Sequence, residues 1–76
     1  MNRERRKVLS DIQTKIEEAK DSLEEVMGEE EECRDNMPEN LHGTERYEQI
    51  EAACDAMYEA VSQLEEAISN IEAAAE

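Results

Sequence analysis

Few residues of this chain are of a type and spacing that would perform chemistry. His42 is the only histidine, and neither a second histidine nor a paired nucleophile accompanies it. Two cysteines and one histidine do not make a tetrahedral zinc set, and no Glu-x-x-His pair is present for a di-metal site. The sequence therefore predicts no enzyme activity, no metal and no cofactor. We expect His42 to serve the turn in which it lies.

The most prominent chemical property of the chain is its negative charge. Twenty-two acidic residues against eight lysines and arginines give a formal net charge of −14. The run Glu29–Glu32 would attract Ca²⁺ loosely but lacks the alternating acids and the glycine of an EF-hand loop. No glycine-rich phosphate loop is present, and two tyrosines are too few for base stacking. Direct binding to nucleic acid is therefore disfavoured.

The size and composition of the chain limit its architecture. With 76 residues and neither Phe nor Trp, a wide globular core or a deep apolar pocket is not expected. No apolar run approaches the ~20 residues of a membrane span, and no signal-peptide pattern opens the chain. We therefore expect no membrane contact and a cytoplasmic location.

A central segment separates two stretches rich in helix-forming residues. Pro38 disfavours helix at the preceding residue, and Gly43 follows shortly after. Thr44 is a suitable N-cap for a second helix. We therefore predict one domain over residues 1–76, with a first helix at about 4–35, a turn at 36–43 and a second helix at about 44–75.

Both predicted helices carry residues at alternating intervals of three and four, which places them on one stripe, the seam of a coiled coil. Only Glu30 interrupts the apolar character of this seam. In the first helix the seam residues are Leu9, Ile12, Ile16, Ala19, Leu23, Val26, Glu30, Cys33 and Met37. In the second helix they are Tyr47, Ile50, Cys54, Met57, Val61, Leu64, Ile68, Ile71 and Ala75.

The two seams also predict how the chain folds back. In an antiparallel hairpin, the numbers of facing residues have a constant sum. They add to 80 along both seams, as for Ile16 with Leu64 and for Glu30 with Ile50. The pivot then falls at residue 40, inside the predicted turn. The expected fold class is all-α, an antiparallel two-helix coiled-coil hairpin.

Alanines beside the second seam suggest a further contact. They recur every seven residues, at Ala53, Ala60, Ala67 and Ala74. One interpretation is that alanine simply suits a helix and narrows the hairpin. The other is a self-association surface through which two hairpins dimerise into a four-helix bundle. Because a single seam barely offsets chain entropy, we expect association with a second copy or with a partner.

The two cysteines are expected to be reduced. Both occupy seam positions, but Cys54 lies one heptad from Tyr47, the residue that faces Cys33. One heptad is about 10 Å of helix, which exceeds the separation that a disulfide spans. The pattern therefore indicates two small buried groups in a reducing compartment, with an intermolecular bridge as the alternative.

Acidic residues recur as pairs along the first helix. The pairs and their neighbour, expected to lie opposite the seam, are Glu17, Glu18, Asp21, Glu24, Glu25, Glu31 and Glu32. Acids on the outer face of the second helix, Glu48, Asp55 and Glu59, are expected to support them. Such a face often serves solubility alone. Like charges on one helix repel, however, and docking of a basic partner would explain why they are kept.

The turn carries a family resemblance. The segment Asn36-Met37-Pro38-Glu39-Asn40-Leu41-His42-Gly43-Thr44-Glu45-Arg46, between Glu-rich amphipathic helices, resembles the turn of small acidic helical-hairpin proteins encoded in phages and prophages of Gram-positive bacteria. The resemblance covers about residues 16–71. It implies a phage protein acting in the bacterial host cytoplasm, in a group that includes anti-CRISPR and other anti-defence inhibitors.

These observations lead to one functional hypothesis and two alternatives. The hypothesis is a non-enzymatic inhibitor whose acidic helical face mimics nucleic acid and binds a basic host protein, such as a nucleic-acid-binding effector or nuclease. The first alternative is a structural or assembly protein that acts by oligomerisation, with acidity serving solubility. The second, a sponge for nucleotide signals, would need a basic pocket that only Arg34, Arg46 and the N-terminal cluster could supply.

Overall fold

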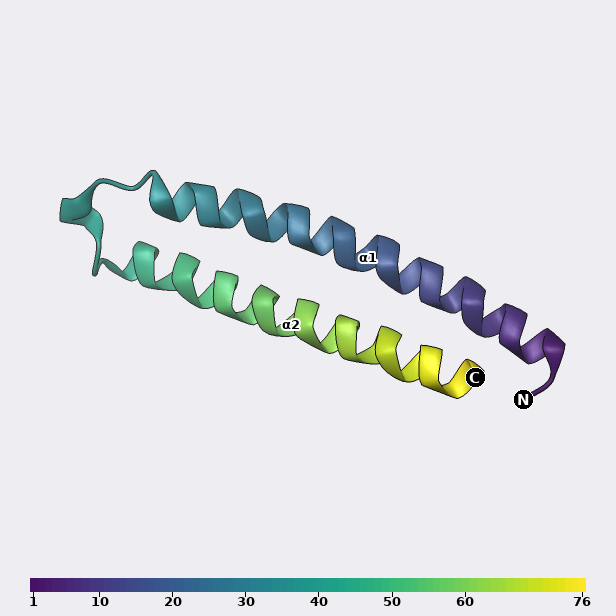
Figure 1. Ribbon diagram of the computed structural model, residues 1–76. Helices are drawn as coiled ribbons and strands as arrows, with labels where there is room; N and C mark the ends of the chain where they lie inside the picture. Colours follow the sequence, from purple (N-terminus) through teal and green to yellow (C-terminus); the bar gives the residue numbers. More distant parts are fainter.

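The computed structural model describes residues 1–76 as two long antiparallel helices joined by a short turn (Figure 1). The helix α1 spans Arg3–Asp35, the 3₁₀ turn η1 spans Glu39–Leu41 and the helix α2 spans Glu45–Ala75. Together they form a rod of 59 × 15 × 13 Å, with the turn at one end and both termini at the other. The predicted all-α helical hairpin is confirmed. Neither helix has an apolar stretch long enough to span a membrane.

Side-chain caps define where both helices begin. The side chain of Asn2 accepts a hydrogen bond of 2.8 Å from the backbone N–H of Arg5, which satisfies a free donor in the first turn of α1. Thr44 caps α2 as predicted, and its hydroxyl accepts a hydrogen bond of 3.3 Å from the N–H of Tyr47. Each cap fixes the direction in which its helix leaves the preceding segment.

The turn is held by local contacts. Gly43 adopts φ = +89°, a left-handed conformation that favours glycine. The imidazole of His42 stacks on the Tyr47 ring with centroids 4.3 Å apart, and its Nε2 lies 3.3 Å from the carbonyl oxygen of Met37. The same hydroxyl of Thr44 donates a 2.7 Å hydrogen bond to the carbonyl oxygen of Leu41. His42 therefore helps to hold the turn in its conformation.

The predicted seam of α2 is confirmed along its whole length. Ile50, Cys54 and Val61 are the three buried residues of the molecule, and every other seam residue of α2 is half-buried. Because only three residues are buried, the hairpin has a narrow core formed by a single line of contact between the helices.

The seam of α1 is predicted correctly only at every second position. Its correctly predicted members are the half-buried residues Leu9, Ile16, Leu23 and Glu30, and Met37, which lies just after the end of α1, is half-buried as well. The other predicted members are exposed, namely Ile12, Ala19, Val26 and Cys33. The half-buried residues that replace them are Gln13, Lys20, Met27 and Arg34. The face that α1 presents to α2 is therefore rotated from the predicted one.

The physical reason for this rotation is that long polar side chains bury their stems while their heads stay in water. Lys20 and Arg34 lie at the edge of the interface, where their side chains are only 23% and 26% exposed. From that position Lys20 also reaches an acid on the opposite helix, as described below. Hydropathy alone favours the exposed apolar positions and therefore misplaces the seam.

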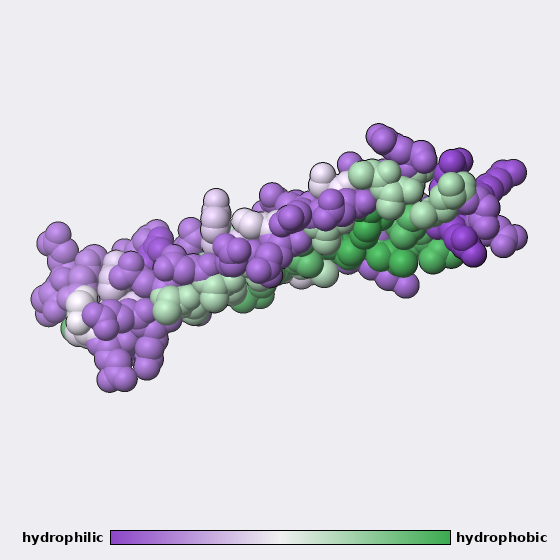
Figure 2. Space-filling model, turned by 90° about the horizontal axis from the view of Figure 1, so that it is seen from below, coloured by the Kyte–Doolittle hydropathy of each residue, from purple (hydrophilic) through white to green (hydrophobic).

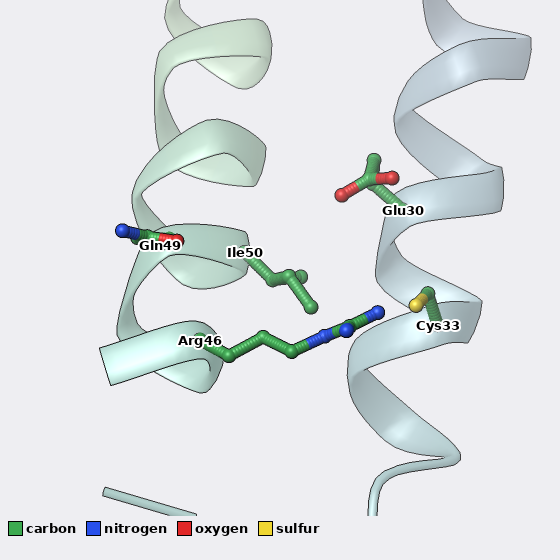
Figure 3. A pocket seen from close by; sticks show the side chains of 5 residues that line it. All are labelled: Glu30, Cys33, Arg46, Gln49 and Ile50. Carbon is green, nitrogen blue, oxygen red and sulfur yellow. The ribbon is translucent and has the colours of Figure 1, made fainter. Parts of the chain in front are cut away.

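The antiparallel register agrees with the prediction near the turn. Glu30 and Ile50, a predicted facing pair, line the same hollow and point toward each other across the helices (Figure 3). Farther along, side-chain contacts join Gln13 to Glu72 and Lys20 to Glu65. These two contacts are one heptad apart on both helices, so the register is constant along the rod.

Candidate functional site

The rotation of α1 gives the hairpin two unlike flanks, one on each side of the line of contact. The first, which we call the acidic flank, is lined by carboxylates from both helices. Its members are Glu17, Asp21, Glu24 and Glu31 of α1 and Glu48, Asp55, Glu65 and Glu72 of α2. On α1 Glu17, Glu24 and Glu31 recur every seven residues, and on α2 the two pairs Glu48 with Asp55 and Glu65 with Glu72 have the same spacing, so the acids within each set lie about 10 Å apart on one face of the helix.

Two polar bridges position the acidic flank. The Gln13 amide donates hydrogen bonds to Glu17 Oε1 at 3.1 Å and to Glu72 Oε1 at 3.0 Å, so it joins the two helices. The Lys20 ammonium lies 3.5 Å from Glu24 Oε1 and 3.8 Å from Glu65 Oε1. These bridges fix the carboxylates of both helices relative to one another and leave most of their charge exposed to solvent.

The middle of the acidic flank surrounds Cys54. Cys54 is only 5% exposed, and burial raises the pKa of its thiol. Glu31, Arg34 and Asp55 line a shallow hollow beside it. Arg34 donates a 3.1 Å hydrogen bond to Asp35 Oδ1, and this bond raises the pKa of the guanidinium. The flank therefore contains a fixed positive charge among its acids.

The outer face of α1 carries the rest of the predicted acidic surface. Glu18, Glu25 and Glu32 are exposed there, as expected of residues opposite the seam. Asp21 is also exposed, but it lines a hollow with Glu17 and Glu65 and therefore belongs to the acidic flank. Glu17 and Glu31 differ from the prediction, since both are half-buried at the edge of the interface. They lie there because the face of α1 that meets α2 is turned toward them.

The supporting acids of α2 divide between two faces. Glu48, Asp55 and Glu59 are all exposed. Asp55 lies beside Glu31 around the same hollow, and Glu48 precedes it by one heptad, so these two belong to the acidic flank. Glu59 falls on the outer face of α2, away from the acids of α1.

Sequence reasoning missed two residues of the acidic flank, Glu65 and Glu72. Both are exposed and both contact a polar residue of α1. A signal for them was present in the sequence, because Gln13 and Lys20 are spaced by seven, as are Glu65 and Glu72. Matched polar spacing on two antiparallel helices indicates contacts across the interface.

The opposite side of the hairpin, which we call the apolar flank, is formed by the misplaced seam residues of α1 and the alanines of α2. Its members are Ile12, Ala19, Val26, Cys33, Ala53, Ala60, Ala67 and Ala74. Ala60 and Ala67 are half-buried and the others are exposed, including Ile12 at 39% and Val26 at 50%. Figure 2 shows a band of hydrophobic side chains along the rod, concentrated in the half nearer the termini, with hydrophilic side chains over most of the turn end.

An open hollow of about 510 Å³ marks the turn end of the apolar flank. It is lined by Glu30, Cys33, Arg46, Gln49 and Ile50 (Figure 3). Arg46 extends from α2 toward α1 and ends near Cys33. Glu30 forms no ion pair with it. The hollow connects both helices but contains no arrangement of nucleophile and base.

The chemistry that these surfaces offer is electrostatic and apolar contact. No group of three or more His, Cys, Asp or Glu is placed to hold a metal ion. Cys33 and Cys54 are both free thiols, and Cys33 is exposed. We found no match to this chain among family models, curated proteins or solved structures.

Proposed function

We propose that the chain is a non-enzymatic inhibitor of phage type that binds a basic, nucleic-acid-handling protein in the bacterial host cytoplasm. The acidic flank and the outer row Glu18, Glu25 and Glu32 would occupy a groove that otherwise receives DNA or RNA phosphates. The observation that carries the proposal is the gathering of carboxylates from two helices on one flank, with only Lys20 and Arg34 among them.

The density of charge along the rod supports mimicry of nucleic acid. A net charge of −14 over 59 Å corresponds to one net negative charge for roughly 4 Å of length. A single strand within duplex DNA carries one charge per ~3.4 Å of helix axis. The acidic flank and the outer row contribute eleven carboxylates to this charge, so a protein groove lined by Lys and Arg would meet a row of negative charges, although a sparser one than a DNA strand presents.

The rigidity of the hairpin supports the same function. Helices of 33 and 31 residues hold the carboxylates in fixed rows, and Gln13 and Lys20 cross-link the rows. A preorganised charged surface loses little conformational entropy on binding, so more of the interaction energy contributes to affinity. Electrostatic complementarity also accelerates encounter with a basic partner.

Charge reversal tests the proposal. We would immobilise the chain, capture proteins from a lysate of a Gram-positive bacterium, and compare wild type with a variant in which Glu24, Glu25, Glu31 and Glu32 are changed to Lys. The variant is expected to lose the captured basic protein while its circular dichroism remains helical. The protein must also be released by duplex DNA or by single-stranded RNA, since mimicry requires a shared groove.

A matched control separates the position of the acids from total charge. Changing Glu39, Glu59, Glu66 and Glu76 to Lys alters the net charge by the same amount, away from the acidic flank and the outer row. This control is expected to keep most of the binding. Equal binding by both variants would contradict the assignment of the surface.

A second candidate function, assembly by self-association, is favoured by the exposed apolar flank. Changing Ala60 and Ala67 to Glu distinguishes the two functions. Loss of oligomer together with loss of activity would favour assembly, whereas loss of oligomer with unchanged inhibition would favour mimicry.

A further inference from the structure

The apolar flank is also the least acidic surface of the molecule. Between its apolar members, on the same side of each helix, lie Lys15, Ser22 and Glu29 of α1 and Gln49, Ala56, Gln63 and Asn70 of α2. Of the 22 acidic residues, only Glu29 and Glu30 therefore lie within the flank, where Lys15 and Arg46 also lie. In so acidic a chain, this distribution indicates a surface that is covered by another protein surface.

We propose that the apolar flank binds a second copy of this chain, in a parallel orientation that places both turns at the same end of a four-helix bundle. The two-fold axis runs along the rod, so that α1 of each copy packs on α2 of the other. This inference does not depend on the proposed function, because the dimer leaves both acidic flanks on the outside.

The register of one hairpin shows why a second copy fits. Rotation about an axis along the rod does not change the height of any residue along the rod. A residue of α1 therefore lies level with the same residue of α2 in the second copy as in its own hairpin, where Glu30 faces Ile50. Val26 then lies level with Ala53 of the second copy, and Ile12 with its Ala67. Larger apolar side chains thus meet alanines, which permit close approach of the helices.

The polar margin of the flank is complementary in the same register. The exposed acids Glu18 and Glu32 come level with Gln63 and Gln49 of the second copy, whose amides are hydrogen-bond donors. An axis perpendicular to the rod would instead pack α1 against α1. That arrangement places the heptad-spaced acids Glu18 and Glu25 opposite like charges, which disfavours it.

A dimer along the whole rod reaches the size of a stable interface. The named flank residues cover about 32 Å of each helix, and the remainder of the 59 Å rod must contribute for each copy to present a face of roughly 800 Å², the typical contribution of one partner to a specific interface. The hairpin alone buries only three residues. A second copy would cover Ile12 and Val26 and give this small chain a wider core.

Neighbouring alanines provide a matched test of the interface. Ala53 lies on the apolar flank. The neighbouring Ala52 is exposed and, because successive residues of a helix are rotated by about 100°, it lies outside this flank. We would measure mass by sedimentation equilibrium. Wild type and A52E are expected at twice 8.7 kDa, with A53E dimerising at least about tenfold more weakly. Circular dichroism verifies that both variants stay helical. A monomeric wild type at high concentration, or equal dimerisation of both variants, would overturn the proposal.

Disulfide cross-linking tests the orientation. In a Cys33→Ser background, A19C and A60C chains are mixed and oxidised. The parallel dimer brings these two positions level across the interface and should give the mixed disulfide. Efficient cross-linking of A60C to itself would overturn the parallel arrangement in favour of the perpendicular axis. Added salt should strengthen this dimer, because it screens the net charge of both copies, whereas it should weaken mimicry-type binding.

Discussion

Glu30 is the acid that lies directly in the line of contact between the helices. It is half-buried opposite the buried Ile50 and forms no ion pair, although Arg46 extends into the same hollow. A carboxylate in this position gains little from its neighbours and gives up part of its hydration. At the scale of single residues, Glu30 therefore weakens the turn end of the seam.

Replacement of Glu30 by leucine should stabilise the hairpin. The change removes a partly desolvated charge and adds apolar contact with Ile50, so we expect the free energy of unfolding to rise by about 1 kcal/mol. Thermal and urea unfolding followed by circular dichroism measure it. Glu32→Leu, on the exposed outer face, is the control and should change stability little. A lower melting temperature for Glu30→Leu would show that the seam is misassigned there.

Stability should also fall in alkaline solution through Cys54. Burial raises the pKa of its thiol above the ordinary value of 9.0, so the folded chain holds this proton more tightly than the unfolded chain. The corresponding stability is complete below about pH 9 and is lost as the pH rises through the folded-state pKa. Unfolding midpoints of wild type and of the Cys33→Ala control should both decrease as the pH rises above about 9 and through the folded-state pKa of Cys54. A fall of the same size in Cys54→Ala would contradict the role of this thiol.

The two helices differ in how far the sequence determines their packing. In α2 apolar side chains occupy one stripe and amides, acids or alanines the others, so the seam follows from spacing alone. In α1 two stripes compete, one containing Ile12 and Val26 and the other Lys20 and Met27. The sequence of α1 alone does not show which stripe faces α2. The stripe with Lys20 and Met27 faces α2 because it makes contacts across the interface, such as that of Lys20 with Glu65.

The sequence likewise determines only part of the candidate site. The acids of the outer row, such as Glu25, were predictable because they recur every seven residues opposite any choice of seam. The position of Glu17 and Glu31 beside acids of α2 was not predictable, because it depends on the rotation of α1. The exposed apolar flank was not predictable either, since spacing and hydropathy place its α1 residues in the seam.

Alanine substitutions at adjacent positions test the rotation of α1. Met27 is half-buried beside Cys54, whereas Val26 is 50% exposed. In an A53E background, which removes contacts with a second copy, we expect Met27→Ala to lower the free energy of unfolding by about 1–2 kcal/mol and Val26→Ala by less than about 0.5 kcal/mol. Urea unfolding measures both. A larger loss of stability for Val26→Ala than for Met27→Ala would contradict the rotation and support the seam predicted from hydropathy.

On the scale of the whole molecule, the hairpin separates two kinds of surface. The acidic flank displays carboxylates of both helices, and the apolar flank is nearly free of acids. A dimer through the apolar flank would turn the two acidic flanks outward, so that each could occupy a basic groove. The narrow core of each hairpin, with only three buried residues, is consistent with a rod whose stability and activity depend on what its two sides contact.

The most direct measurement of the central claim is the affinity of the captured host protein as a function of salt, with duplex DNA as competitor. Contact between the acidic flank and a basic groove predicts at least about tenfold weaker binding between about 50 and 200 mM salt, and displacement of the chain by DNA. An affinity that stays constant over this range, in a complex that DNA does not displace, would contradict nucleic-acid mimicry.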